Sequence, residues 1–364
     1  MRILNLVAGE KWTGPAAVVF DQTAALVAAG LEAQFACVSG SLLAERLLPL
    51  GWVRPLITHP RTPVNLLGDA SRLRETIRRE KFDILHAHTT HDHAIALLAA
   101  RGTSAMVART FHHVRYARGN PATRFLLRGT KAFAFSNRAI GEEFGEPGTV
   151  LPPVVDTERF RPGPGRDETW RQFGVPPGAL AAGTVGKMAA GRGHEEAIRA
   201  AARVPGLASV HIGHGERMPE LKRLAESVGA GGRNVFVGYQ EDALPDLYRS
   251  WDIFLFPASG SEQGQRAILE AMASGLPVVA LDVPGVRDLM TDGVEGFVAV
   301  SEDEIVKALA RLTASADLRR EMGAKARQRS LGYTAERFVE KAREFYNRAI
   351  ALEAGGGKPL PYGT

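Results

Sequence analysis

The sequence predicts an α/β protein built from two doubly wound domains, and three observations support this fold class. Short runs rich in β-branched residues alternate with amphipathic stretches along nearly the whole chain. The alternation stops at a segment dense in proline and glycine, residues 150–165, and then starts again. The chain has 364 residues, enough for two domains that each bury a core. Mostly apolar strands that alternate with helices indicate parallel sheets covered on both faces.

The first half of the chain supplies the elements of one such sheet. The expected strands are residues 2–7, 33–39, 83–88, 105–112 and 132–136. Residues 16–29 and 70–79 lie between them and have apolar spacings typical of helices. We therefore predict a first domain over residues 1–155.

The second half repeats the pattern after the Pro/Gly-rich segment 150–165, which we interpret as the interdomain linker. The expected strands are residues 182–186, 209–213, 235–237, 253–256, 278–281 and 297–300. They predict a second domain over residues 166–333. A long helix follows over residues 334–352, where apolar side chains recur at spacings of three and four. Because this helix comes after the last strand, it need not belong to the second sheet.

Composition narrows the class of protein. Apolar residues make up 45% and charged residues 23%, which is typical of a globular protein. Cys37 is the single cysteine, so no intramolecular disulfide can form, and its apolar surroundings favour inert packing over nucleophilic chemistry. The apolar runs are shorter than the roughly 18 residues of a membrane span. We expect a cytoplasmic protein, with contact to the inner face of the membrane left open.

The net charge of +5 is concentrated in the first domain. Residues 94–140 hold no aspartate or glutamate but several lysines and arginines. Such a patch attracts anions. The stretch 101–138 is therefore a candidate surface for an anionic acceptor or for peripheral contact with acidic lipid. A solvated basic face is the alternative. A nucleic-acid partner is not expected, because aromatic and basic residues do not interleave there.

Residues 256–277 carry the pattern most suggestive of chemistry. A buried strand ends, a polar loop follows, and a helix begins near Gln265. Ligands of doubly wound sheets bind beyond the carboxyl ends of strands, and the free N–H groups of a helix start bind anions. Gly264 lets the backbone approach such a ligand. Glu262 and Glu270 can accept hydrogen bonds from sugar hydroxyls. These features predict a site for a diphosphate and its attached sugars.

A second loop supplies cations. The strand 182–186 runs into KMAAGRGHEEAI, in which Lys187 and Arg192 flank a short turn before a helix. Two cations in such a turn suit a pyrophosphate. Taken alone, they are better explained as solvated loop side chains. Together with the loop around Glu262 and Glu270, they favour the diphosphate interpretation.

The chain resembles the retaining glycosyltransferases of the GT-B fold, family four, also described as glycosyl transferases group one. The signature of that family is a Glu, seven residues and a second Glu, here Glu262 and Glu270, followed by AMASGLPVV. The segments VLPPVVDTERFRP, DLYRSWDIFLFPA and DGVEGFVAV resemble other parts of the family sequence. The resemblance covers most of the chain and is strongest over residues 150–300.

The resemblance implies a fold and a set of roles. Two Rossmann-like domains would face each other across a cleft, and the helix 334–353 would pack back onto the first domain. Glu270 would hold the nucleotide ribose, and Glu262 would contact the donor sugar. The diphosphate would be bound by Lys187, Arg192 and the backbone of Gly264, Gln265 and Arg266.

Two departures from the family pattern concern the donor site. The family has Arg first and Lys second, whereas this chain has Lys187 and then Arg192. The usual Gly-Phe-Gly after the first Glu is Gln263-Gly264-Gln265. These changes leave the donor sugar open. The loop after the first strand keeps Gly14 of the family's glycine pair, but Pro15 replaces its partner and removes an N–H donor.

His112 is the expected catalytic histidine of the first domain. Thr110-Phe111-His112 ends a strand and resembles the family's Thr-x-His, whose histidine lies close to the reacting sugar. A structural histidine is the alternative. His86, His88, His91 and His93 suggest a metal site. Because the family works without such a metal, we expect none, and a cleft-lining role for His88 or His91 is left open.

The resemblance implies a retaining glycosyltransferase that transfers a hexose from a nucleotide-diphosphate sugar. The expected acceptor is an anionic saccharide or a lipid-linked one, in the synthesis of lipopolysaccharide or another cell-envelope glycan. No cofactor or metal is expected. Two alternatives remain: a nucleotide-sugar epimerase on the same fold, and a non-catalytic protein that binds nucleotide sugars.

Overall fold

The computed structural model describes residues 1–9, 14–59, 62–113, 125–130, 132–145, 149–164, 174, 178–259 and 265–354. The chain divides into two compact units, Met1–Val154 with Ala335–Thr364, and Val155–Thr334. Each unit holds one sheet whose strands are all parallel, so the predicted α/β class with two doubly wound domains is confirmed. Residues 155–164, which we assigned to the linker, lie in the second unit.

The first unit contains a seven-stranded sheet with the strand order β3-β2-β1-β4-β5-β6-β7. Its strands are β1 (Arg2–Leu6), β2 (Glu32–Val38), β3 (Val53–Ile57), β4 (Ile84–Ala87), β5 (Met106–Phe111), β6 (Ala132–Phe135) and β7 (Thr149–Val150). The helices are α1 (Gly14–Ala28), α2 (Leu42–Leu47), η1 (Leu48–Leu50), α3 (Pro63–Glu80), α4 (Thr90–Ala100), α7 (Arg138–Phe144) and α16 (Ala335–Ala354).

Two strands of this sheet, β3 and β7, were not predicted. β3 contains Pro55, which has no N–H to donate to a sheet ladder. Its position explains how the proline is tolerated, because β3 lies at the edge and pairs with β2 alone. β7 lies at the other edge and is two residues long.

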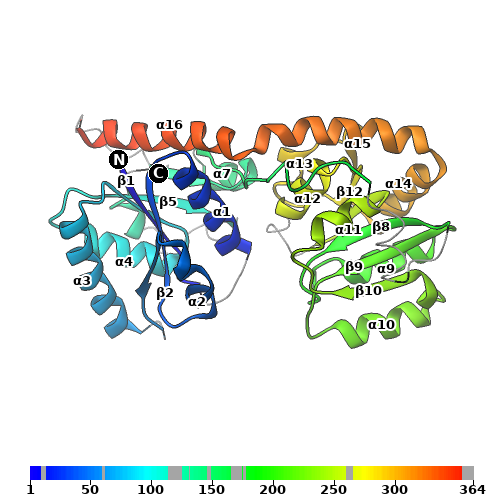
Figure 1. Ribbon diagram of the computed structural model, residues 1–364, viewed down its shortest axis with the longest axis horizontal. Helices are drawn as coiled ribbons and strands as arrows, with labels where there is room; N and C mark the ends of the chain where they lie inside the picture. The colour runs from blue at the N-terminus through cyan, green and yellow to red at the C-terminus, as the bar shows by residue number, and fades with distance from the viewer. Residues whose placement is uncertain are drawn as a thin grey trace. The chain divides into compact units, whose positions relative to one another are not determined.

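Helices cover both faces of the first sheet. α3 and α4 pack side by side over one face, where Leu73 and Ile95 are buried against the strands. α1 and the late helix α16 cover the other face (Figure 1). Phe338, Phe345 and Tyr346 of α16 are buried there, so the apolar stripe of this helix is part of the first unit's core.

The second unit contains a six-stranded sheet with the order β10-β9-β8-β11-β12-β13 (Figure 1). Its strands are β8 (Leu180–Val185), β9 (Leu207–Ile212), β10 (Asn234–Gly238), β11 (Ile253–Phe256), β12 (Val278–Leu281) and β13 (Gly296–Ala299). The helices are α9 (His194–Ala202), α10 (Met218–Ser227), η2 (Gly231–Arg233), α11 (Leu244–Ser250), α12 (Gln265–Ala273), α13 (Val286–Leu289), α14 (Glu302–Ala314), α15 (Ala316–Ser330) and η3 (Leu331–Tyr333).

The strand order places the ligand-binding edge of each sheet. In the first unit the order reverses between β1 and β4, and in the second between β8 and β11. The loops after two such strands diverge, and the crevice between them is where open α/β sheets bind ligands. The segments that follow β8 and β11 are the two loops singled out in the sequence, and His88 follows β4.

Candidate functional site

The loop after β8 is a short ordered turn that carries both predicted cations. Met188 donates from its backbone N–H to the His214 carbonyl at 3.1 Å, and the Arg192 N–H donates to the Ala189 carbonyl at 3.3 Å. Lys187 is exposed, and its Nζ lies 3.2 Å from Oε2 of Glu216. Arg192 is half-buried. The turn therefore presents one exposed cation and one half-buried cation just before α9.

Gly193 brings this turn against the segment that follows β11. Its φ of +87° is a conformation that favours glycine. A Cβ at this position would lie 2.8 Å from the Ala258 backbone nitrogen and 2.9 Å from Cδ of Pro257. The close approach places the end of the β8–α9 loop directly beside the start of the β11–α12 loop. The two loops predicted to share a ligand are thus neighbours.

Glu270 lies on α12 and is buried, with an exposed fraction of 5%. Its Oε1 accepts from Nε of Arg266 at 2.9 Å, and its Oε2 accepts from the Tyr248 hydroxyl at 3.1 Å. Burial raises the pKa of Glu270, while the Arg266 guanidinium and the Tyr248 hydroxyl act in the opposite direction. Each carboxylate oxygen has a further lone pair, so this site can still accept a hydrogen bond from a ligand hydroxyl.

Sequence reasoning missed Tyr248, and it assigned only the backbone of Arg266 to the site. The spacing of Arg266 and Glu270 by four on a helix could have predicted their side-chain contact. Tyr248 comes from α11, and only the packing of α11 against α12 brings it to Glu270.

Several predicted residues cannot be placed. Glu262 and Gly264 lie outside the described residues. Gln265 begins α12, and its side chain also lies outside the description. Gly14 begins α1, next to the loop that follows β1.

In the first unit, His112 directly follows β5 and lies beside His88, which directly follows β4. Its Nε2 lies 3.1 Å from Nδ1 of His88, and the ring centroids are 5.3 Å apart. His86 bonds through Nδ1 to the Tyr346 hydroxyl of α16 and through Nε2 to Thr110, both at 2.7 Å. The pairing of β4 with β5 brings these side chains together.

A buried ion pair supports this edge of the sheet. Oδ1 of Asp92 lies 3.6 Å from Nη1 of Arg109 and accepts from the Thr89 N–H at 2.6 Å. Oδ2 of Asp92 accepts from the Ala8 N–H at 3.3 Å, so α4 is tied to the loop after β1. Burial raises the pKa of Asp92 to about 6, although Arg109 acts to lower it. Arg109 was expected in the basic surface stretch 101–138. That assignment is wrong, because the side chain is 3% exposed.

The histidines of this edge are neutral at neutral pH. Burial lowers the pKa of His112 to about 3, and Arg109 and His113 lower it further. Burial also lowers the pKa of His86 and of His93 to about 3. Within the described parts of the chain, no three or more His, Cys, Asp or Glu side chains are arranged to hold a metal ion. His93 bonds to Thr130 at 2.7 Å. Cys37 is buried, which raises its pKa to about 11 and makes it a poor nucleophile.

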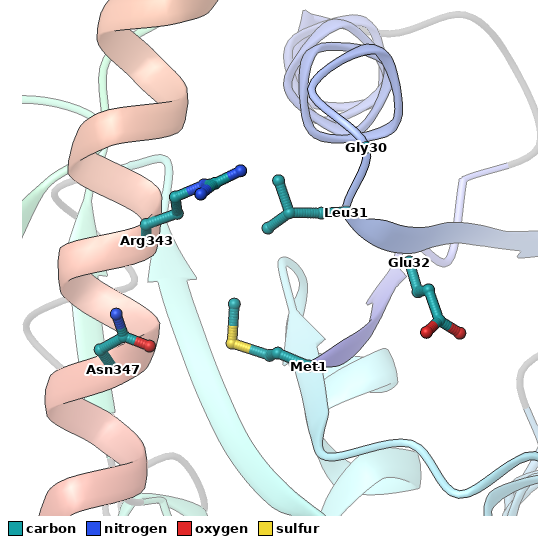
Figure 2. Close-up of a pocket in the computed structure, with 6 residues that line it drawn as sticks. All are labelled: Met1, Gly30, Leu31, Glu32, Arg343 and Asn347. Carbon is teal, nitrogen blue, oxygen red and sulfur yellow. The ribbon is translucent and has the colours of Figure 1, made fainter.

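Two hollows of the first unit lie away from the carboxyl edge of its sheet. The first, of about 260 Å³, lies where β1 and β2 begin, with Arg343 and Asn347 of α16 facing Met1 and Leu31 across it (Figure 2). The second, of about 560 Å³, lies between α3, α4, the start of β5 and residues 125–129. Leu66, Leu97 and Phe125 line this second hollow, which we call the apolar groove, together with Arg101 and Arg128.

Among the described helices, none is both long and apolar enough to span a bilayer.

Comparison with known proteins adds independent findings. Residues 12–159 match the family model Glycosyltransferase Family 4, and residues 166–329 match Glycosyl transferases group 1. The chain is 28% identical over 305 residues to the 2-deoxystreptamine N-acetyl-D-glucosaminyltransferase of Streptomyces fradiae, covering 81% of this chain and 67% of the relative. It is 29% identical over 264 residues to the GDP-mannose-dependent alpha-(1-6)-phosphatidylinositol monomannoside mannosyltransferase of Mycobacterium tuberculosis, covering 64% and 68%.

A solved structure resembles the whole fold. Anabaena HepE, in complex with UDP and glucose, superposes with a TM-score of 0.83 at 18% identity, covering 96% of this chain and 100% of HepE. At this identity the likeness concerns the fold, and it confirms the predicted GT-B architecture.

Proposed function

Since the chain belongs to the GT-B-fold glycosyltransferases, whose two family models match its two halves, we propose that it is a retaining enzyme with a nucleoside-diphosphate sugar as donor. The proposed acceptor is a saccharide or a lipid-linked saccharide of the cell envelope. The observation that carries the donor assignment is the contact of Gly193 with Pro257 and Ala258. This contact unites the cation-bearing loop after β8 with the segment leading to α12 and Glu270.

In the proposed donor complex, Lys187 and Arg192 bind the diphosphate together with free N–H groups at the start of α12. Glu270 accepts hydrogen bonds from the ribose hydroxyls, and Arg266 and Tyr248 hold its carboxylate in place. Glu262 contacts the donor sugar. HepE has been crystallised with UDP and glucose, which supports a nucleoside diphosphate as the ligand.

The proposed reaction is a front-face displacement at the anomeric carbon. The bond from C1 to the diphosphate oxygen breaks, and a bond from C1 to the acceptor oxygen forms on the same face. The acceptor proton passes to the departing phosphate oxygen. Lys187 and Arg192 stabilise the charge that develops on the diphosphate, an electrostatic effect that grows as the bond breaks. Because the chain supplies these cations itself, we propose that activity does not require a metal ion.

Donor binding by the Glu270 variant tests the site. Glu270→Ala should weaken binding of the donor nucleotide at least about 100-fold, since a buried carboxylate with two hydrogen-bonded hydroxyls is worth about 3 kcal/mol. Glu321→Ala is the matched control, because Glu321 is an exposed carboxylate of the same unit that pairs with Lys325. Calorimetric titration with UDP, GDP and their sugars measures the affinity. An unchanged affinity for the Glu270 variant would remove the site assignment.

Product stereochemistry tests the retaining mechanism. The anomeric proton coupling of the first product formed should match that of the α-linked donor, and the opposite coupling would show inversion. Turnover should also persist when a chelator removes divalent ions. Release of a free epimer in the absence of acceptor would indicate an epimerase.

The apolar groove supports a lipid-linked acceptor and peripheral contact with acidic membrane. Phe125 is 65% exposed, and Val64 and Leu67 of α3 are also exposed. Arg101 and Arg128 line the groove and can attract anionic headgroups. The Mycobacterium tuberculosis relative, whose name specifies a phosphatidylinositol monomannoside, is consistent with such an acceptor.

Vesicle binding tests this surface. Charge reversal at Arg101 and Arg128 should weaken binding to vesicles rich in acidic phospholipid at least about 30-fold in co-sedimentation, since each cation near such a surface contributes about 1 kcal/mol and two are lost. Charge reversal at the exposed Arg320 and Arg337 is the matched control. Equal binding by the two double variants would argue against the groove as the contact.

A further inference from the structure

A line of buried hydrogen bonds leads from α1 to His112. The Thr23 hydroxyl lies 2.7 Å from the Val19 carbonyl, and Nδ2 of Asn5 lies 3.0 Å from the Thr23 oxygen. Oδ1 of Asn5 lies 3.3 Å from Nε2 of His88, whose Nδ1 lies 3.1 Å from Nε2 of His112. The four linked side chains, Thr23, Asn5, His88 and His112, are all buried. We call this line the histidine relay.

The first members of the relay fix its direction. A carbonyl oxygen can only accept, so the Thr23 hydroxyl donates its one proton to Val19. The Thr23 oxygen must then accept from Asn5, which requires the amide nitrogen of Asn5 on that side. The amide oxygen of Asn5 is consequently the atom that faces His88.

The direction then passes through both imidazoles. Because Asn5 offers an oxygen, Nε2 of His88 carries the proton and donates it. A neutral imidazole has one N–H, so Nδ1 of His88 is a lone pair and accepts from Nε2 of His112. We infer that Asn5 and His88 are positioning residues that hold His112 as its Nε2–H tautomer, with the lone pair on Nδ1.

Because the contact between His88 and His112 is buried, the other tautomer of His112 is strongly disfavoured. The opposite tautomer of His112 would place two lone pairs against each other at 3.1 Å, without water to fill the contact. A buried polar group without its hydrogen bond costs about 1–3 kcal/mol, so the alternative would be populated at about one-sixth or less. The low pKa values of His88 and His112 agree, since both rings stay neutral.

The tautomer decides what His112 can bind. A lone pair on Nδ1 accepts a hydrogen bond from a hydroxyl and repels a phosphate or carbonyl oxygen. This step rests on the proposed function and on the role that the family resemblance implies for His112, a contact with the reacting sugar. The relay therefore selects a sugar hydroxyl, of donor or acceptor, as the partner of His112 and excludes the diphosphate from that role.

Imidazole nitrogen chemical shifts test the relay directly. Long-range ¹H–¹⁵N spectra of the full chain labelled with ¹⁵N-histidine distinguish protonated from unprotonated ring nitrogens. His112 should show a protonated Nε2 and an unprotonated Nδ1 at neutral pH, with its signals assigned by comparison with His112→Gln. A protonated Nδ1 in the native protein would overturn the inference whether or not the enzyme is active.

Variants of the relay add a functional readout. His88→Leu removes the acceptor, so His112 should show a mixture of tautomers and a kcat/KM about ten-fold lower, as expected for one lost hydrogen bond. His88→Asn keeps an oxygen near the position of Nδ1 and should restore both. His86→Gln is the matched control, a buried histidine two residues earlier in the chain that bonds to Tyr346 and Thr110 instead.

The outcomes separate the two proposals. If His112 has the expected tautomer but no nucleotide sugar is turned over, the relay stands and the proposed function fails. If turnover is normal and the tautomer is the same in the native protein and in His88→Leu, the positioning role of His88 is refuted. Because the tautomer is measured in the native protein and only the signal assignment uses His112→Gln, poor folding of His88→Leu does not block the test.

Discussion

Each unit of the molecule buries a pair of histidines near the carboxyl edge of its sheet. The two pairs need different numbers of ring protons to satisfy all of their hydrogen bonds. In the first unit, His88 and His112 make two contacts, one with each other and one with Asn5. Two neutral rings bring two protons, one for each contact. All hydrogen bonds of this pair are therefore satisfied when both rings are neutral.

The pair in the second unit, His194 and His211, has acceptors at both ends. Nε2 of His194 faces the Gly186 carbonyl at 3.1 Å, and the two Nδ1 atoms are 3.2 Å apart. Nε2 of His211 faces Oδ1 of Asn234 at 3.1 Å, because the amide nitrogen of Asn234 donates to the Ala230 carbonyl. Three contacts need three protons, and two neutral rings bring two.

The contrast shows that the partners of a buried histidine, more than its burial, decide which charge state satisfies its contacts. Burial lowers the pKa of all four rings. In the second pair, the Gly186 carbonyl and the Asn234 side chain oppose this effect. Gly186 directly precedes Lys187, so the pair that is short of a proton lies beneath the proposed diphosphate loop.

Acidification should produce the largest effect, and it should act mainly on the first unit. The pKa values of His86, His93 and His112 there are about 3, whereas in the second unit the pKa of His211 is lowered to about 3. Because these values lie below the ordinary 6.5, the unfolded chain binds more protons in acid. Stability is therefore complete above about pH 6.5 and falls as the pH drops toward 3.

Each such histidine should cost up to about 3 kcal/mol at about pH 4.5. Asp92, whose pKa is raised to about 6, has the opposite sign and offsets part of the loss in the first unit. Hydrogen exchange of peptides from β4 and β9, corrected for intrinsic rates, should show the first unit opening before the second. Simultaneous opening, or earlier opening of the second unit, would contradict the prediction that the first unit, with more histidines of lowered pKa, is the more sensitive to acid.

The β8–α9 loop, which belongs to the second unit and carries the proposed diphosphate-binding cations, offers a second test. Gly193→Ala should destabilise the protein by about 3 kcal/mol, since it combines a strained φ with a Cβ pressed against Ala258. Gly206→Ala is the control, because Gly206 has a φ of +75° but open space around its Cα. Its cost should be about 1 kcal/mol in urea unfolding. Similar losses of unfolding free energy in both variants would mean that the two loops are not in close contact.

Replacing the asparagine of each pair by leucine, which has a similar shape, tests the proton count itself. Asn5→Leu leaves the Nε2–H of His88 without an acceptor and should cost about 2 kcal/mol. Asn234→Leu removes one of three acceptor contacts, so two protons then suffice for the other two, while the Ala230 carbonyl and Nε2 of His211 lose their partner. It should cost about 1 kcal/mol less than Asn5→Leu in matched unfolding curves. Reversal of this order would refute the count.

The smallest expected effect is the order in which the two histidine pairs take up a proton as the pH falls. A proton added to the His194–His211 pair fills an existing contact, whereas one added to His88 or His112 has no such contact to complete within the relay. The second pair should therefore take up its proton at a higher pH than His88 or His112. A pH titration of the histidine ring signals measures this order. Earlier protonation of His112 would contradict it.

Local patterns in the sequence account for much of the fold. The apolar runs of β11 and β12 match the structure at both ends, because a strand buried on both faces reads as a continuous apolar segment. The period of α16 predicted its buried stripe. β3 escaped prediction because Pro55 is unfavourable in a strand, and only its position at the sheet edge makes it acceptable.

The residues of the candidate site also divide into those that the sequence predicted and those that only the structure shows. Lys187, Arg192 and Glu270 could be named from the sequence, because strand, loop and helix follow one another along the chain. Their roles in donor binding stay predictions. Tyr248 could not be named, since it reaches Glu270 through the packing of one helix on another.

By itself, the sequence determined the two parallel sheets, the loops at their carboxyl ends and the family to which the chain belongs. These features depend on residues close together in the chain, whose apolar period and turn chemistry are local. Only the tertiary structure decided how many protons each histidine pair needs. His88 and His112 are 24 residues apart, and Asn5 is 83 residues from His88. Strand pairing brings such partners together, and the hydrogen-bonding capacity of each partner then fixes the tautomer.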